Sequence, residues 1–116
     1  MENNFHGELR KKMNTCVHLV YALTRKFPRE ELYGATSQLR RAILSVILNY
    51  IEGYARGRDK VHKNFLEISY GSLQEAKYLL SFALEEGYIL REEYENVLIF
   101  VDDIGGMLWG ILRRMP

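Results

Sequence analysis

Residues 9–27 read LRKKMNTCVHLVYALTRKF, and this stretch decides the class of fold. Its apolar side chains follow one another at steps of four, three, four, three and four residues: Leu9, Met13, Cys16, Val20, Leu23 and Phe27. This spacing places them on one face of an α-helix, which repeats every 3.6 residues or so. Pro28 should end the helix, because its ring removes an N–H donor and clashes with the preceding turn. Residues 28–34 are then a connector that contains one helical turn.

The same alternation of three and four recurs in three later stretches. The expected core faces are Leu39, Ile43, Val46, Tyr50 and Gly53, then Phe65, Ile68, Ser72, Ala76, Leu79 and Ala83, and finally Tyr94, Val97, Val101, Ile104, Leu108 and Ile111. We therefore predict helices over about residues 8–27, 36–56, 60–86 and 91–113 of one domain, residues 1–116. Short turns between long helices favour an all-α, antiparallel, up-down-up-down four-helix bundle.

The ends of the predicted helices carry residues typical of caps. Thr36 and Ser37 can cap the second helix, and Asp59 can cap the third, because short polar side chains accept hydrogen bonds from free N–H groups. Gly57 and Gly87 can each end a helix, because glycine adopts the left-handed conformation without a steric penalty.

Glycines inside the predicted helices need a reason, since each costs about 1 kcal/mol relative to alanine. They are Gly71, Gly105, Gly106 and Gly110. One interpretation is tight packing within a single bundle, and the other is close helix contact between subunits. Both are packing roles rather than catalytic ones.

Composition excludes several classes of protein. With 47% hydrophobic and 27% charged residues, the chain is typical of a globular protein. Its longest strongly apolar run, residues 97–101, is too short to span a bilayer. The N-terminal residues MENNFHGELRKK lack the apolar segment of a signal peptide. Cys16 is the single cysteine, so no intramolecular disulfide forms, and we expect a cytoplasmic protein.

The sequence contains no pattern of catalytic or metal-binding residues. No Glu-x-x-His pair occurs, and His6, His18 and His62 lie on different predicted elements. A phosphate-binding loop, a Gly-x-Ser-x-Gly elbow and a His-Glu-x-x-His motif are all missing from the sequence. Cys16 lies on an apolar stripe, which favours a buried thiol over a nucleophile. We therefore expect no enzymatic activity, no metal and no cofactor.

Charge is unevenly distributed although the net charge is only +1. Residues 1–64 carry 12 Lys and Arg against 6 Asp and Glu, whereas residues 65–116 carry 4 against 9. In an antiparallel bundle, two basic clusters should share one end with Arg113 and Arg114. These clusters, which we take as nucleic-acid-binding candidates, are Arg10, Lys11 and Lys12, and Arg56, Arg58, Lys60 and Lys63. Such an end would attract phosphates, and Tyr54 nearby could stack on a base.

Glu52 is the carboxylate that most needs an explanation. It lies near the predicted C-terminus of the second helix, where the helix dipole disfavours negative charge. Arg56, four residues later, can neutralise it through a local ion pair. The alternative is a charge at a contact between subunits or at a ligand site.

A family resemblance emerges around the second helix. Residues 34–42, GATSQLRRA, followed by Ser45, Asn49, Glu52 and Gly53, resemble the bacterial 23S rRNA intervening-sequence proteins, also named four helix bundle proteins or S23 ribosomal proteins. Further matches lie at Phe27-Pro28, Phe65-Leu66, Ile68, Gly71-Ser72-Leu73, Glu75 and Gly87-Tyr88-Ile89, so the likeness covers nearly the whole chain.

The resemblance implies antiparallel four-helix bundles that assemble into ring-like homopentamers without enzymatic activity. A similar fold serves as the accessory protein of diversity-generating retroelements, which implies a reverse transcriptase and RNA or DNA as partners. The chain departs from the family pattern in two places. Residues 45–49 read SVILN and lack the proline often found there, and Trp109 is the only tryptophan, where the family usually has one in the first helix.

Two functional hypotheses follow. In the first, the protein is an oligomeric binding module that contacts structured RNA, or RNA together with a protein partner, through its basic surface. Arg40 and Arg41 then belong to that surface or hold the oligomer together. In the second, the protein is a self-associating scaffold without a nucleic-acid role, and the basic half of one subunit faces the acidic half of its neighbour.

Overall fold

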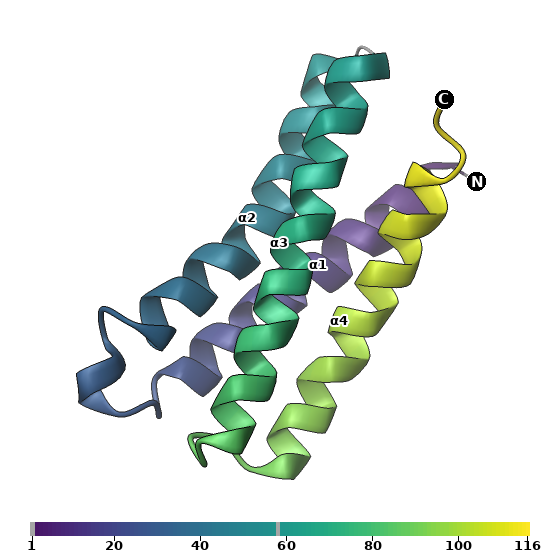
Figure 1. The fold of residues 1–116 in the computed structure, drawn as a ribbon. Helices are drawn as coiled ribbons and strands as arrows, with labels where there is room; N and C mark the ends of the chain where they lie inside the picture. Colours follow the sequence, from purple (N-terminus) through teal and green to yellow (C-terminus); the bar gives the residue numbers. More distant parts are fainter. Residues whose placement is uncertain (1, 58) are drawn as a thin grey trace.

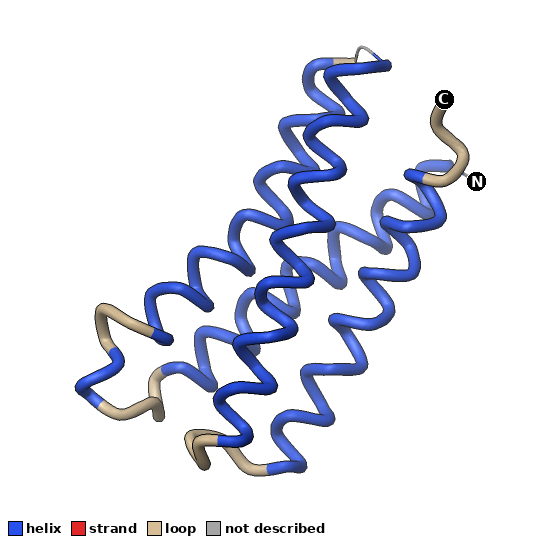
Figure 2. Tube along the Cα trace, in the orientation of Figure 1, coloured by secondary structure: helices blue, strands red, loops and turns tan. Residues whose placement is uncertain are grey.

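A computed structural model describes residues 2–57 and 59–116. Its elements are α1 (Glu2–Thr24), the short 3-10 helix η1 (Arg29–Glu31), α2 (Ala35–Arg56), α3 (Asp59–Glu85) and α4 (Arg91–Leu112). The chain reverses direction at each connection, so the start of α1 and the end of α4 lie at the same end of the bundle (Figure 1). Figure 2 shows helix throughout, with short loops and no strand in these residues. The predicted all-α four-helix fold is confirmed.

The core faces predicted for the first two helices are confirmed. Every side chain predicted on those faces is buried, from Leu9 to Phe27 and from Leu39 to Gly53. The fourth face is confirmed at its centre, where Val97, Val101, Ile104 and Leu108 are buried. Tyr94 and Ile111, at its two ends, are half-buried.

The core face predicted for the third helix is wrong by one residue over most of its length. The side chains that α3 buries are Leu66, Ser69, Leu73, Ala76, Leu80 and Ala83. Ile68, expected in the core, is 43% exposed, and Phe65, Ser72 and Leu79 are half-buried. One residue corresponds to about 100° around a helix. Beside its buried stripe α3 carries partly buried apolar side chains such as Phe65 and Leu79. Its apolar surface is therefore wider than one stripe, and spacing alone does not locate its centre.

The first helix begins earlier and ends earlier than predicted. α1 starts at Glu2 rather than at residue 8 and stops at Thr24, three residues before Phe27. The Thr24 hydroxyl donates to the carbonyl of Val20 at 2.9 Å. Pro28 disfavours helical backbone in the residue before it, which is why the helix does not reach the proline. The helical turn expected in the connector is confirmed as η1.

The predicted N-caps are wrong. Thr36 and Ser37 lie inside α2, whose N-cap is Gly34. The first N–H group of α2, at Ala35, donates to Oε1 of Glu31 at 2.9 Å, so a side chain from η1 does the capping. This happens because the connector folds back onto the start of the helix.

Of the other predicted helix ends, the N-cap at Asp59 is wrong, and the two glycine ends are confirmed. Asp59 is the first residue of α3 rather than its cap. Gly57 and Gly87 do end their helices, with φ values of +68° and +78° in the left-handed region that favours glycine.

Glu31 also ties together the two connectors at the end of the bundle away from the termini. Its Oε2 accepts a hydrogen bond from the Tyr88 hydroxyl at 2.7 Å. The hydrogen bonds from Ala35 and Tyr88 lower the pKa of Glu31, and the same contact with Glu31 raises the pKa of Tyr88 to about 12. An ion pair between Lys26 and Glu93 lies at this end as well.

Of the four mid-helix glycines, tight packing inside the bundle accounts for one. A Cβ built at Gly105 would lie 3.4 Å from Cδ2 of Leu73, whereas nothing lies within 4 Å of a Cβ at Gly71, Gly106 or Gly110. The intramolecular interpretation is therefore wrong for those three. A contact between subunits there stays a prediction.

Within the described residues, none of the helices is both long and apolar enough to cross a membrane.

Candidate nucleic-acid interface

Basic side chains of α1 and α3 lie in the halves of these two helices nearer the end of the bundle that holds both termini. Arg10 and Lys11 are exposed on α1, and Lys60 is exposed at the start of α3. The ammonium group of Lys63, also on α3, donates to the carbonyl oxygen of Pro116 at 3.1 Å, which joins α3 to the last residue of the chain. We call Arg10, Lys11, Lys60 and Lys63 the basic end. Arg58, also predicted to take part, lies outside the described residues.

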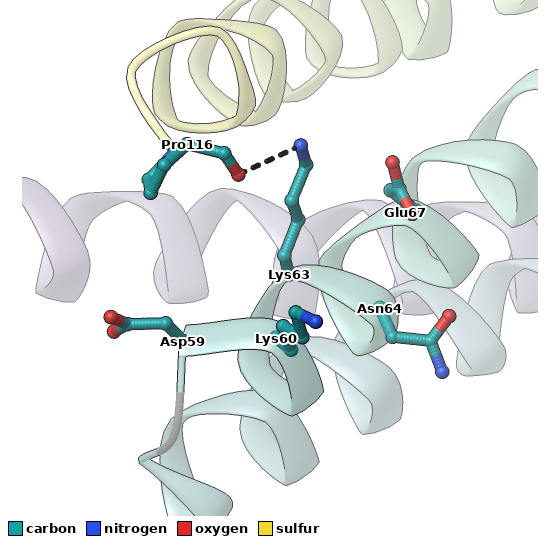
Figure 3. A pocket seen from close by; sticks show the side chains of 6 residues that line it. All are labelled: Asp59, Lys60, Lys63, Asn64, Glu67 and Pro116. Atoms are coloured by element: carbon teal, nitrogen blue, oxygen red, sulfur yellow. Dashed lines mark hydrogen bonds between the residues drawn. The ribbon is translucent and has the colours of Figure 1, made fainter.

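A surface hollow of about 730 Å³ opens beside the first turns of α3 (Figure 3). Its lining residues are Asp59, Lys60, Lys63, Asn64, Glu67 and Pro116. In Figure 3, the lysines lie between Asp59 and Glu67, and Lys63 reaches across to Pro116. Two ammonium groups and two carboxylates therefore share this hollow, so a phosphate would have to contact the lysines from the solvent side.

Two of the basic candidates are engaged in ion pairs. Nζ of Lys12 lies 3.4 Å from a carboxylate oxygen of Asp103 on α4. Nε of Arg56 lies 2.7 Å from Glu52, so the local ion pair expected for Glu52 is present. Exposed pairs of this kind stabilise a fold by about 0–1 kcal/mol, because water screens them. Neither pair would strongly oppose a competing phosphate.

Arg40 and Arg41 lie away from the basic end. They are near the start of α2, at the opposite end of the bundle from the start of α3 (Figure 1). Nε of Arg40 donates to the Thr24 hydroxyl at 2.7 Å, and its guanidinium lies over the Tyr21 ring at 4.6 Å. Arg41 is exposed. Arg40 and Arg41 therefore do not form one continuous basic surface with the residues of the basic end.

A cluster of two histidines and two tyrosines lies next to the basic end, and the sequence did not predict it. Nδ1 of His6 lies 2.5 Å from the Tyr50 hydroxyl, and Nε2 of His6 lies 3.4 Å from the Tyr54 hydroxyl. The Tyr54 ring also contacts His62, with ring centroids 4.1 Å apart. Tyr50 and Tyr54 are four residues apart, a spacing that suggests a shared helix face. No comparable signal links His6 to His62.

The surroundings of this cluster favour the uncharged forms of Tyr50, Tyr54 and His62. Burial is the main cause that raises the pKa of Tyr50 well above its ordinary value, and burial also raises the pKa of Tyr54. Desolvation, followed by the nearby His6, lowers the pKa of His62. Nε2 of His62 is buried without a hydrogen-bond partner among the described residues. Tyr54 is 38% exposed, so the cluster presents one aromatic ring to solvent beside positive charge.

Two chemical properties of the described residues are their capacity to bind a metal ion and the state of their single thiol. Among the described residues, no group of three or more His, Cys, Asp or Glu side chains could hold a metal ion. Cys16 is buried, as predicted, and burial raises the pKa of its thiol to about 12. A thiol in that state is a poor nucleophile, because the thiolate is the reactive form.

Comparisons with known proteins identify a matching family and a solved structure with a similar fold. A family model described as 23S rRNA-intervening sequence protein matches residues 7–110. A crystal structure of a protein with unknown function from the S23 ribosomal protein family of Bacteroides thetaiotaomicron VPI-5482 superposes with a TM-score of 0.83 and 22% sequence identity. The match covers 90% of this chain and 97% of the other, and it shows a shared fold. No curated protein matches this chain.

Proposed function

Because this chain belongs to the 23S rRNA-intervening sequence protein family, we propose that it is a non-enzymatic module that binds structured RNA through the basic end. The observation that supports this proposal most is that Arg10 and Lys11 on α1 and Lys60 and Lys63 on α3 lie toward one end of the bundle, where Lys63 also contacts Pro116. Phosphate groups would be the first targets of these side chains, because neutralising them releases condensed counterions.

The cluster beside the basic end supports RNA rather than a small anion as the ligand. Tyr54 is partly exposed and lies against His6 and His62. An unpaired base can stack on such a ring, a contact worth about 1–3 kcal/mol. Phosphate contacts from the basic end and stacking on Tyr54 would together favour RNA loops or bulges, whose bases are free to stack.

We further propose that the protein acts as a homo-oligomer, for which the family resemblance implies five subunits. Several basic ends on one assembly would combine weak phosphate contacts into strong binding, since each later contact is intramolecular. A reverse transcriptase, or another protein that itself binds RNA or DNA, would be a compatible partner for such an assembly.

A specific observation favours a second candidate, a self-associating scaffold without a nucleic-acid role. Nothing lies within 4 Å of a Cβ built at Gly71, Gly106 or Gly110. On α4, which carries Gly106 and Gly110, Ile99 and Trp109 are 62% and 53% exposed. Glycines permit close approach of another helix, and exposed apolar side chains gain from being covered. In this case the basic residues would meet acidic residues of a neighbouring subunit.

Fluorescence anisotropy with a labelled RNA hairpin tests the first proposal. Binding should persist at about 0.15 M salt, with log affinity falling linearly in log salt. The variant Lys60→Gln/Lys63→Gln should bind roughly 10- to 30-fold more weakly, because two phosphate contacts are lost. The matched control Lys77→Gln/Arg91→Gln removes the same charge elsewhere and should bind nearly as well as the native protein. Absence of binding at low salt, or equal loss in both variants, would reject the basic end as the RNA site.

The role of Arg40 and Arg41 in assembly is tested by the mass of the particle in solution. The variant Arg40→Glu/Arg41→Glu should lower the mass measured by light scattering if these arginines hold subunits together. If they contact RNA instead, the mass should stay constant while RNA affinity falls. Unchanged mass and unchanged affinity would remove both residues from either role.

A further inference from the structure

Three arginines surround one surface hollow at the corner between α1 and α2. Arg25, Arg29 and Arg40 line it, and its volume is about 360 Å³. The remaining wall is largely apolar and includes Phe27 and Leu32. This corner lies at the opposite end of the bundle from Lys60 and Lys63, as the end of α1 and the start of α3 in Figure 1 show.

Arg40 is held in place before any ligand arrives. Its Nε donates to the hydroxyl of Thr24, which is 3% exposed and is itself bonded to the backbone of α1. The Arg40 guanidinium also lies over the Tyr21 ring at 4.6 Å. A planar guanidinium has several N–H donors, and these contacts engage only part of them. The rest can bind an anion with little loss of side-chain entropy, because the side chain is already fixed.

No carboxylate in the described part of the chain forms an ion pair with these three arginines. Two acidic side chains of this end have other partners: Glu31 binds Ala35 and Tyr88, and Glu93 binds Lys26. Glu30, which follows Arg29 in η1, is exposed and forms no ion pair in the described residues. Three like charges therefore converge without an ion-pair partner of their own, and a bound anion would relieve their repulsion.

We propose that this arginine hollow binds a phosphate group carried on an apolar or aromatic body. Guanidinium groups match phosphate oxygens through paired hydrogen bonds, which favours phosphate over a spherical anion. Phe27 and Leu32 would contact the organic part of the ligand. The phosphate belongs to a small organic molecule or to the terminal nucleotide of a nucleic acid, two sources with the same chemistry. This site does not depend on the basic end or on RNA binding there.

Nuclear magnetic resonance titration of the full chain with phenyl phosphate tests the proposal. The amide signals of Thr24, Leu32 and Thr36 should shift and saturate. The variant Arg25→Gln/Arg29→Gln should weaken binding by about tenfold, since each exposed charge contact contributes up to about fivefold. Arg41→Gln removes a neighbouring charge that does not line the hollow, so its affinity should stay native. Absence of saturable shifts at these amides, or equal weakening by Arg41→Gln, would overturn the proposal.

Further probes separate the role of the phosphate from that of its carrier. Benzyl alcohol, which lacks the phosphate, should not bind measurably, and inorganic phosphate should bind more weakly than phenyl phosphate. Stronger binding of a 5′-phosphorylated trinucleotide than of its unphosphorylated form would assign the hollow to nucleic-acid ends. Binding of phenyl phosphate without that preference would assign it to small organic phosphates. Equal binding of benzyl alcohol and phenyl phosphate would refute phosphate recognition.

Discussion

Nδ1 of His6 lies 2.5 Å from the hydroxyl of Tyr50, and this contact joins the first turns of α1 to α2. Tyr50 is 1% exposed, and burial raises the pKa of its hydroxyl. The phenol therefore keeps its proton, and its hydroxyl can donate to an unprotonated Nδ1 of His6 or accept from a protonated one. The contact places His6 against Tyr50 and Tyr54 of α2, beside His62 of α3.

Stability should fall as the pH drops from about 7.5 to about 5, where histidines gain protons. Burial lowers the pKa of His62 below its ordinary value of 6.5, and His6 lowers it further. Between the lowered and the ordinary value, the unfolded chain binds more protons than the folded one, so the free energy of unfolding rises with pH. The groups facing this cluster are Tyr50 and Tyr54 of α2, Arg10 of α1 and Asp59 of α3; among them Asp59 alone opposes the shift of His62.

Urea unfolding at several pH values measures this effect. The variant His62→Gln should flatten the dependence, whereas His18→Gln, at an exposed position of α1, should leave it as in the native chain. Glu31, whose pKa is lowered from 4.5, contributes stability that is lost at more acidic pH, so it does not obscure this window. A native chain equally stable at both pH values would contradict this contribution of His62.

Tyr50→Phe should lower the free energy of unfolding by about 0.5–1.5 kcal/mol, the usual net value of one hydrogen bond. The substitution keeps the packed ring and removes only the hydroxyl that His6 contacts. Tyr78→Phe is the matched control, because Tyr78 is 66% exposed and should be near neutral. Urea unfolding followed by circular dichroism gives both values, and a neutral Tyr50→Phe would mean that the contact contributes nothing to stability.

Gly53→Ala and Gly71→Ala should have opposite effects. A Cβ at Gly53 would lie 3.1 Å from side-chain atoms of His62 and Phe65 and 3.3 Å from the His62 carbonyl. The backbone of α3 cannot move away easily, so we expect destabilisation by about 1–3 kcal/mol. Gly71 has nothing within 4 Å, so alanine there should stabilise the subunit by about 0.5–1 kcal/mol. Thermal unfolding of the two variants measures the contrast, and the same sign for both would refute it.

Cys16 should react with thiol reagents only when the protein unfolds. Burial raises the pKa of its thiol to about 12, so both access and thiolate are missing in the folded state. The rate of labelling by a chromogenic disulfide should therefore follow the opening of the whole bundle. The variant Thr15→Cys/Cys16→Ser, which places the thiol at an exposed neighbouring position, should react at once. Fast labelling of native Cys16 would show that α1 opens separately.

How much of the fold the sequence predicts depends on how many apolar stripes each helix carries. The positions of Val20 on α1 and Val46 on α2 follow from spacing, since each of these helices has a single clear apolar stripe. α3 has a second stripe one residue away, and packing selects Leu73 over Ser72 for the core. Capping depends on tertiary structure too, since Glu31 reaches Ala35 from another element.

The sequence predicts which basic residues lie toward the same end of the bundle. It does not predict the contacts that these residues and their neighbours make. Basic clusters and alternating helix directions are enough to expect Lys63 near the end of the chain. The pairing of Lys12 with Asp103 joins residues 91 positions apart, and the contact of His6 with Tyr50 joins residues 44 positions apart. No local pattern encodes such distant partners, because they depend on the rotation of each helix about its own axis.

Trp109, the single tryptophan, lies on the outside of α4 beside Tyr70, with ring centroids 6.0 Å apart and half of its surface in contact with solvent. Its intrinsic fluorescence therefore reports the environment of that outer face rather than the packing of the core. Unfolding should shift its emission little, whereas a partner or second subunit that covers α4 should shift the emission to shorter wavelength. The fluorescence of Trp109 can therefore be used to detect association at this surface.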